Sequence, residues 1–102
     1  MRRMMVRYKL KPDRVQENQA YVQKVFADLK RSQPAGLRYA SFVGSDGVTM
    51  FHIVSVETTD GDNPLTHSPA FQAFTAGVHD RCEEPPVSIA LDEIGSYHFF
   101  EK

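Results

Sequence analysis

The feature that most constrains the fold of this 102-residue chain is a switch in the spacing of its apolar side chains. Residues 4–11 largely alternate between apolar and polar side chains, which is typical of a strand with one buried face. Residues 14–31 contain no glycine or proline, and their apolar side chains recur every three or four residues, as in an amphipathic helix. The chain is therefore expected to begin with a strand followed by a helix.

A hairpin and a second helix are predicted from the residues that follow. Residues 37–43 and 48–57 have the composition of strands, and the Gly-Ser-Asp-Gly sequence between them is typical of a tight turn. Residues 69–82 carry an apolar stripe at helical spacing. Ser68 directly before Pro69 is a typical helix start, because serine caps a helix and proline is tolerated in its first turn.

The end of the chain is predicted to form one long strand. Glu84-Pro85-Pro86 is expected to break the second helix, and residues 87–100 to supply a strand long enough to reach a second subunit. The resulting order, β-α-β-β-α-β, is that of an α+β, ferredoxin-like fold, in which a four-stranded antiparallel sheet carries two helices on one face. The length fits a single domain that spans residues 1–102.

The face of this sheet without helices is predicted to mediate self-association. If Met50 faces the helices, then Phe51 and Ile53 lie on the bare face, together with Met5 and Arg7 of the first strand. Apolar side chains mixed with charged ones on an uncovered sheet face favour contact with a second copy of the chain. We therefore expect a homodimer.

The charge distribution excludes several classes of partner. Twelve basic and thirteen acidic residues leave a formal charge of −1. Most basic residues lie in positions 1–38, but they alternate along a strand or are distributed around a helix, unlike the basic stripe of a nucleic-acid-binding protein. They are expected to attract the acidic remainder of the chain, either within the fold or across a subunit contact. No apolar run approaches the roughly 18 residues of a membrane span, so neither nucleic acid nor a membrane is predicted as a partner.

The single cysteine, Cys82, excludes a disulfide within the chain and a cysteine-cluster metal site. A chain without paired thiols suits a reducing compartment such as the cytoplasm. Cys82 lies on the apolar stripe of the second predicted helix, which predicts a buried and inert thiol. The histidines have no short metal-ligand spacing, and neither a metal nor a cofactor is predicted.

One stretch, His67-Ser68-Pro69-Ala70-Phe71-Gln72-Ala73-Phe74, resembles the start of the second helix in antibiotic-biosynthesis-monooxygenase-like proteins, members of the dimeric α+β barrel superfamily. The resemblance covers nearly the whole chain in architecture and about eight residues in motif. It implies a dimeric α+β barrel with a pocket between helices and sheet, and cofactor-independent oxygenation of a quinol- or phenol-like aromatic. It does not extend to the haem-degrading branch, because the chain has no tryptophan.

Three polar side chains are candidate catalytic residues. Asn18 interrupts the apolar stripe of the first helix, where a polar group needs a partner or a cavity. His52 shares a strand face with Met50 and Val54, so a neutral imidazole beneath the helices could accept a phenolic proton. The alternative for His52 is a core histidine whose hydrogen bonds are satisfied. His67, from the family-like motif, would line the mouth of the pocket or pack over the helix start.

The predicted substrate-binding residues are four aromatic side chains expected between helices and sheet, namely Tyr8, Phe26, Phe71 and Phe74. In this interpretation the protein supplies proximity, a base and a dry cavity. The alternative function is a non-catalytic homodimer that binds a small apolar ligand or serves as an assembly module.

Overall fold

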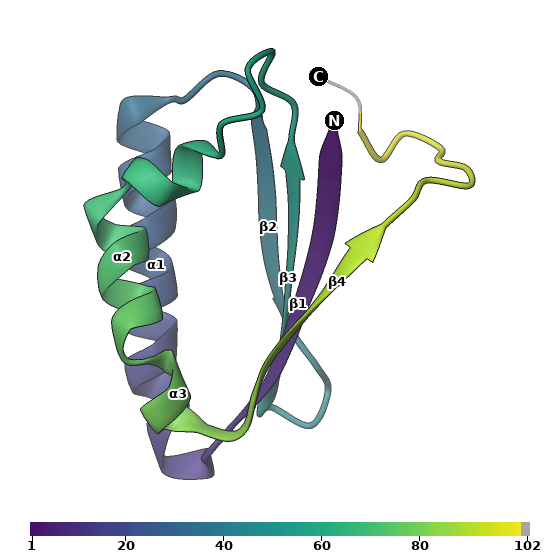
Figure 1. Ribbon diagram of the computed structural model, residues 1–102. Helices are drawn as coiled ribbons and strands as arrows, with labels where there is room; N and C mark the ends of the chain where they lie inside the picture. The colour runs from purple at the N-terminus through teal and green to yellow at the C-terminus, as the bar shows by residue number, and fades with distance from the viewer. Residues whose placement is uncertain (101–102) are drawn as a thin grey trace.

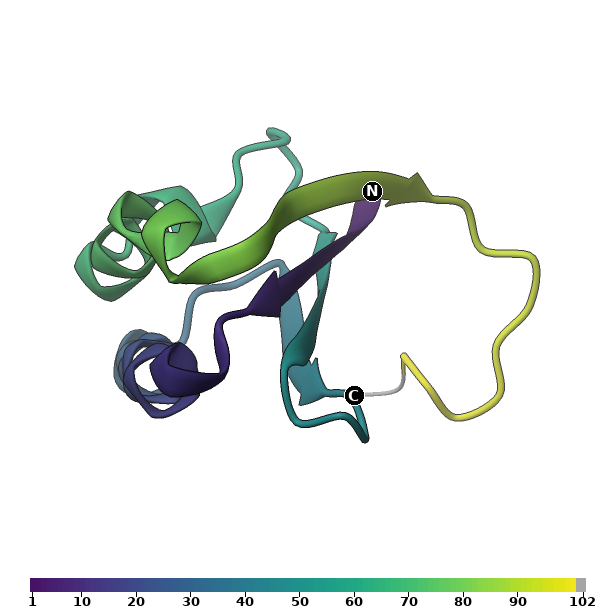
Figure 2. The same ribbon diagram turned by 90° about the horizontal axis from the view of Figure 1, so that it is seen from below.

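The computed structural model describes residues 1–100 and shows a four-stranded sheet with helices on one face (Figures 1 and 2). Its strands follow the order β2-β3-β1-β4, and every pairing is antiparallel. The strands are β1 (Arg2–Leu10), β2 (Leu37–Val43), β3 (Thr49–Val56) and β4 (Cys82–Leu91). The helices are α1 (Val15–Ser32), α2 (Pro69–Ala76) and α3 (Val78–Arg81), with the 3-10 turns η1 (Pro12–Arg14) and η2 (Pro64–His67). The predicted ferredoxin-like α+β fold is confirmed.

The core lies between the sheet and the helices. In the pairing of β1 with β3, Tyr8 is opposite Met50 and Val6 is opposite His52, so the even-numbered side chains of both strands share the helix-facing side. The buried apolar residues gather on this side: Tyr8, Leu10, Val25, Met50, Val54, Val56, Leu65, Phe74, Val78 and Cys82. The predicted burial of Cys82 is confirmed, and burial raises the pKa of its thiol.

The second helix differs from the prediction because it is divided. α2 ends at Ala76, and Gly77 has a φ of −118° and a ψ of 7°, outside the helical region. α3 then continues for only four residues. Glycine destabilises a helix interior by about 1 kcal/mol relative to alanine, which favours a break at this position. The predicted helix start is correct, since the Ser68 hydroxyl accepts a hydrogen bond from the backbone N–H of Phe71.

The prediction of a final strand over residues 87–100 is wrong at both ends, because β4 runs from Cys82 to Leu91. Pro85 and Pro86 lie within it. This is possible because β4 pairs with a single neighbour, β1, and its register shifts by one residue beside the two prolines. Residues 92–100 leave the sheet and form a loop on the side away from the helices (Figure 2).

Oppositely charged side chains pair between neighbouring strands. Arg7 of β1 lies 3.3 Å from Glu84 of β4, and Lys9 lies 3.8 Å from Glu83. The predicted attraction between the basic first part of the chain and its acidic remainder thus occurs within the fold. These pairs are partly exposed, so each contributes little to stability. No helix within residues 1–100 is long and apolar enough to cross a membrane.

Candidate functional site

The candidate site is centred on His52, a buried histidine of β3 that is only 4% exposed and faces the helices. Its Nε2 atom lies 2.7 Å from the hydroxyl oxygen of Tyr8. Its Nδ1 atom lies 2.7 Å from the hydroxyl oxygen of Ser41 and 2.8 Å from that of Tyr39, both on β2. Both ring nitrogens are therefore held by hydroxyl groups of neighbouring strands.

A buried arginine and an asparagine extend this network toward the helices. Asn18 of α1 is completely buried, and its side-chain amide donates a hydrogen bond of 3.0 Å to the Tyr8 hydroxyl. Arg81 of α3 is 1% exposed, and its Nε–H donates to the side-chain oxygen of Asn18 at 3.1 Å. The same guanidinium donates to the carbonyl of Phe74 at 2.8 Å and lies 4.5 Å from the ring centroid of Tyr21.

The direction of these hydrogen bonds is set by Arg81. A guanidinium can only donate, so the oxygen of the Asn18 amide faces Arg81 and its NH₂ group faces Tyr8. The Tyr8 hydroxyl accepts from Asn18 and is left to donate its own proton to Nε2 of His52. A neutral His52 then carries its proton on Nδ1, from which it donates toward Ser41 and Tyr39.

Burial fixes the charge states of the central groups. It lowers the pKa of His52 to about 4, and it raises the pKa of Tyr39 to about 12. Burial also raises the pKa of Tyr8, an effect that the hydrogen bond from Asn18 partly opposes. At neutral pH the imidazole is therefore unprotonated on Nε2, and both phenols keep their protons.

His52 borders two separate pockets. The α2-side pocket, of about 310 Å³, lies between the sheet and α2, and its walls include Tyr8, Tyr39, Leu65, Phe71 and Phe74. Apart from the hydroxyls and imidazole of the central cluster, these walls are mainly apolar. Such a lining, with a few convergent polar groups, is typical of a site for a small organic ligand.

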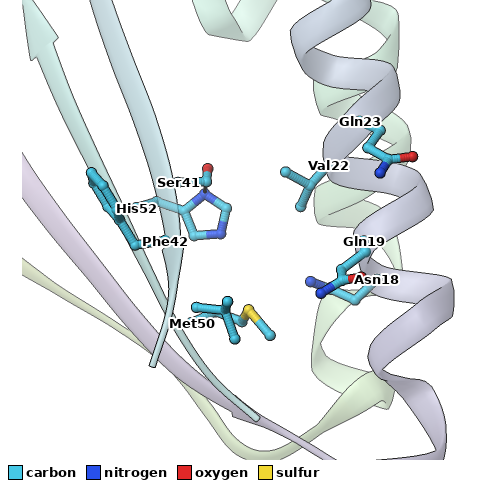
Figure 3. Close-up of a pocket in the computed structure, with 9 residues that line it drawn as sticks. Asn18, Gln19, Val22, Gln23, Ser41, Phe42, Met50 and His52 are labelled. Atoms are coloured by element: carbon cyan, nitrogen blue, oxygen red, sulfur yellow. Dashed lines mark hydrogen bonds between the residues drawn. The ribbon is translucent and has the colours of Figure 1, made fainter. Parts of the chain in front are cut away.

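The α1-side pocket is smaller, about 150 Å³, and lies between α1 and strands β2 and β3 (Figure 3). Ser41 and His52 lie next to each other on the sheet, across from Asn18 and Gln19 of the helix (Figure 3). It is lined by both polar and apolar residues, namely Asn18, Gln19, Val22, Gln23, Ser41, Phe42, Val43, Met50 and His52. His52 thus separates a mainly apolar pocket from a more polar one.

The structure brings some of the predicted site residues together. Tyr8, Phe71 and Phe74 line the α2-side pocket with His52, and Asn18 reaches the cluster through Tyr8. Phe26 is outside both linings and stacks on Tyr39, with 5.1 Å between ring centroids.

His67 lies apart from the cluster. It is the last residue of η2, the turn before α2, and its side chain is 70% exposed. Its Nε2 atom is 2.7 Å from a carboxylate oxygen of Asp62. It lines neither of the two pockets that His52 borders. Among residues 1–100, no group of three or more His, Cys, Asp or Glu side chains is placed to hold a metal ion.

Sequence reasoning missed three members of the cluster: Tyr39, Ser41 and Arg81. The alternation along β2 could have indicated the first two, since Tyr39 and Ser41 share the face of Leu37. Arg81 follows Phe74 by seven residues, close to two helical turns, which places it near the apolar stripe. A charged residue in that position is a signal for a buried ion.

The fold and the buried hydroxyl–imidazole cluster define a small α+β protein with a ligand-sized pocket between its helices and sheet. No protein-family model and no curated protein matches the sequence. Solved structures do match: an antibiotic biosynthesis monooxygenase aligns with a TM-score of 0.75 and 12% identity over 93% of this chain and 100% of its own.

Two further solved structures have the same fold. A putative antibiotic biosynthesis monooxygenase from Nitrosomonas europaea aligns with a TM-score of 0.74 and 12% identity, over 91% of this chain and 89% of its own. A mutant of SnoaB, a cofactor-independent oxygenase from Streptomyces nogalater, aligns with a TM-score of 0.69 and 11% identity, over 93% of this chain and 94% of its own. The chain therefore has the fold of the antibiotic biosynthesis monooxygenases, as its sequence resemblance predicted.

Proposed function

We propose that this protein is a homodimeric, cofactor-independent monooxygenase that acts on a quinol- or phenol-like aromatic in the α2-side pocket. The observation that carries the proposal is the Tyr8–His52 hydrogen bond of 2.7 Å in the wall of that pocket. A volume of about 310 Å³ is within the usual range for small-ligand sites. Phe71 and Phe74 would contact the ring of the substrate, and the hydroxyls of the cluster would orient its polar group.

The proposed chemistry begins with removal of a proton from the substrate hydroxyl. The substrate passes its proton to the Tyr8 oxygen while Tyr8 passes its own to Nε2 of His52. The resulting phenolate is electron-rich enough to react with O₂ directly. One oxygen atom enters the ring as a quinone oxygen, and the other takes up two protons and leaves as water, which balances the two hydrogens that the substrate loses. The substrate supplies all the electrons, so the reaction needs no redox cofactor.

The bare face of the sheet supports the homodimer in this proposal. Val87 and Ile89 of β4 are 55% and 51% exposed, and they pair with Arg7 and Met5 of β1 on the face away from the helices. Phe42 of β2 is also about half exposed on this side. Exposed apolar side chains on one face of a sheet favour a symmetric contact with a second copy. Light scattering should give twice the chain mass, and Ile89→Lys should shift it toward the monomer.

A second candidate function is non-catalytic binding of a small aromatic ligand, as the α2-side pocket alone would allow. The observation that favours it is that both ring nitrogens of His52 already have hydrogen-bond partners within the protein. Its lowered pKa also makes the imidazole a weak base. In this case the cluster would serve to fix the shape and polarity of the pocket wall.

Oxygen consumption with a panel of quinols and phenols distinguishes the two functions. A monooxygenase should consume O₂ with at least one probe, and Tyr8→Phe should slow it by about 100-fold or more, the usual effect of losing a proton-transfer group. Tyr97→Phe is the matched control, because it removes the hydroxyl of an exposed tyrosine outside the pocket. A probe that raises the melting temperature without consuming O₂ would support binding alone. If no probe does either, both functions are wrong.

A further inference from the structure

We infer that the α1-side pocket is a proton outlet, in which Ser41 transfers the Nδ1 proton of His52 to water on the side opposite the substrate pocket. That this proton comes originally from the substrate rests on the proposed function. The outlet itself is a property of the ligand-free protein and can be measured without a substrate.

The need for an outlet follows from the position of His52. Once Nε2 receives the proton of Tyr8, the ring carries two protons and a positive charge, in a buried position that already disfavours the charged form. The guanidinium of Arg81 is buried in the same network, two hydrogen bonds beyond Tyr8 from the imidazole. The imidazolium must therefore lose a proton before the substrate can react further, and Nδ1 is the nitrogen that does not return it to Tyr8.

Two hydroxyl groups are within reach of Nδ1, and they lead to different places. The hydroxyl of Tyr39 is 2.8 Å away and belongs to a residue of the α2-side pocket, so transfer to it would return the proton to the substrate side. The hydroxyl of Ser41 is 2.7 Å away and belongs to a residue of the α1-side pocket (Figure 3). Transfer through Ser41 separates the proton from the phenolate that it left.

The α1-side pocket has the size and polarity that water requires. Its volume of about 150 Å³ is well above the roughly 10–15 Å³ that one water needs. A stable water also needs two to four polar partners, and the pocket offers Ser41, Asn18, Gln19 and Gln23. Gln19 and Gln23 are exposed residues, which places this pocket next to bulk solvent. The α2-side pocket also has polar residues beyond the central cluster, Asn63, Thr75 and His79, but they lie in a larger lining that is mainly apolar.

The transfer balances without any other reactant. The substrate O–H bond breaks as a new O–H bond forms on Tyr8, and the original Tyr8 proton forms the Nε2–H bond of His52. The Nδ1–H bond then breaks as the proton moves to the Ser41 oxygen, and the original Ser41 proton passes to water. The substrate becomes a phenolate and the water becomes a hydronium ion, while the three side chains remain neutral.

Hydrogen exchange of the His52 Nδ1–H, followed by NMR in ¹⁵N-labelled ligand-free protein, tests the outlet. Ser41→Ala should slow this exchange by about tenfold, the change expected when one hydrogen bond is lost from a transfer path. Ser41→Thr keeps a hydroxyl and should restore the rate. Tyr39→Phe is the matched control, because it removes the other hydroxyl at Nδ1 and should leave the rate unchanged. Slower exchange in Tyr39→Phe with normal exchange in Ser41→Ala would overturn the proposal.

A second pair of variants tests the pocket itself and keeps the Nδ1 partners intact. Val22→Phe fills the α1-side pocket and should slow the exchange, whereas Thr75→Phe narrows the α2-side pocket and should not. The backbone amides of β3 report global unfolding in each variant. If Nδ1–H exchanges only as fast as the slowest of these amides in the wild type, the outlet does not exist.

The proposed function and the outlet can fail separately. If no probe leads to oxygen consumption but the exchange rates follow the expected pattern, the monooxygenase is refuted and the outlet is supported. If oxygen consumption depends on Tyr8 but the Nδ1–H exchange rate does not change when Ser41 or Val22 is substituted, only the outlet is refuted.

Discussion

Lowering the pH should destabilise the folded protein through His52, whose pKa is depressed from an ordinary value of 6.5 to about 4. Between these two pH values the unfolded chain binds a proton at this residue and the folded protein does not, so the unfolding free energy falls as the pH falls. The full effect, reached near pH 4, is about 3 kcal/mol. At about pH 5 the loss is about 2 kcal/mol, a large part of the stability of a domain of this size.

The assay is urea unfolding of the wild type and of His52→Gln at about pH 7.5 and about pH 5. The glutamine can accept from Tyr8 as Nε2 does, but it does not titrate. Comparing the wild type with the variant cancels the contribution of every other titrating group to the pH dependence of stability. Carboxylates such as Asp46, whose pKa is lowered to about 2 by hydrogen bonds from Thr49, change the stability mainly at lower pH. The wild type should lose about 2 kcal/mol more than the variant over this range.

Two results would refute this reasoning. A difference below about 0.5 kcal/mol between wild type and variant would mean that the imidazole is not held neutral by burial. If His52→Gln does not fold, the ring protons of His52 in the wild type can be titrated directly by NMR. A midpoint near 6.5, the ordinary value, would then contradict the structure.

Three further predictions concern other parts of the fold. Gly36→Ala should lower the unfolding free energy more than Gly47→Ala in urea unfolding. Both glycines have a positive φ, 75° and 78°, so either substitution strains the backbone. A methyl group at Gly36 would in addition lie 2.8 Å from a neighbouring side-chain carbon, whereas Gly47 faces open space. Equal losses would contradict the packing around Gly36. Arg81→Met removes the donor that orients the Asn18 amide, so the ¹⁵N shifts of His52 should show a mixture of both neutral tautomers. If His52 stays entirely in the Nδ1–H form, Arg81 does not set its tautomer. Cys82, buried and with a raised pKa, should react with a thiol reagent much more slowly in the folded protein than in urea, and equal rates would contradict its burial.

The fold could be predicted from the sequence because hydrophobic spacing depends on which face of each element is buried. Residues 4–11 and 14–31 alternate at spacings that only a strand and a helix satisfy. The final strand was misplaced because prolines usually mark the end of a strand or helix. Pro85 and Pro86 are accommodated by a register shift at the edge of the sheet, which depends on the arrangement of strands and not on local sequence.

The site could be predicted only in part. Strand periodicity placed His52 on the helix-facing side, and the interrupted apolar stripe placed Asn18 opposite it, as the structure has them. The motif around His67 gave no information on its distance from the pocket, because that depends on how η2 approaches the sheet. The spacing of Arg81 from Phe74 only places it near the apolar stripe, and an arginine at the end of a helix is usually exposed. Its burial depends on Asn18, which comes from a different helix.

The two prolines in β4 also determine how this sheet can contact other sheets. β4 is an edge strand, and Pro85 and Pro86 have no backbone N–H to offer to an incoming strand. Addition of a further strand, the first step of sheet extension into fibrils, is therefore blocked in this part of the edge. From Val87 to Leu91 the register of β4 against β1 is regular, so this stretch keeps regularly spaced N–H groups. The protein can thus carry apolar side chains on the bare face of its sheet without offering an open edge along the whole of β4.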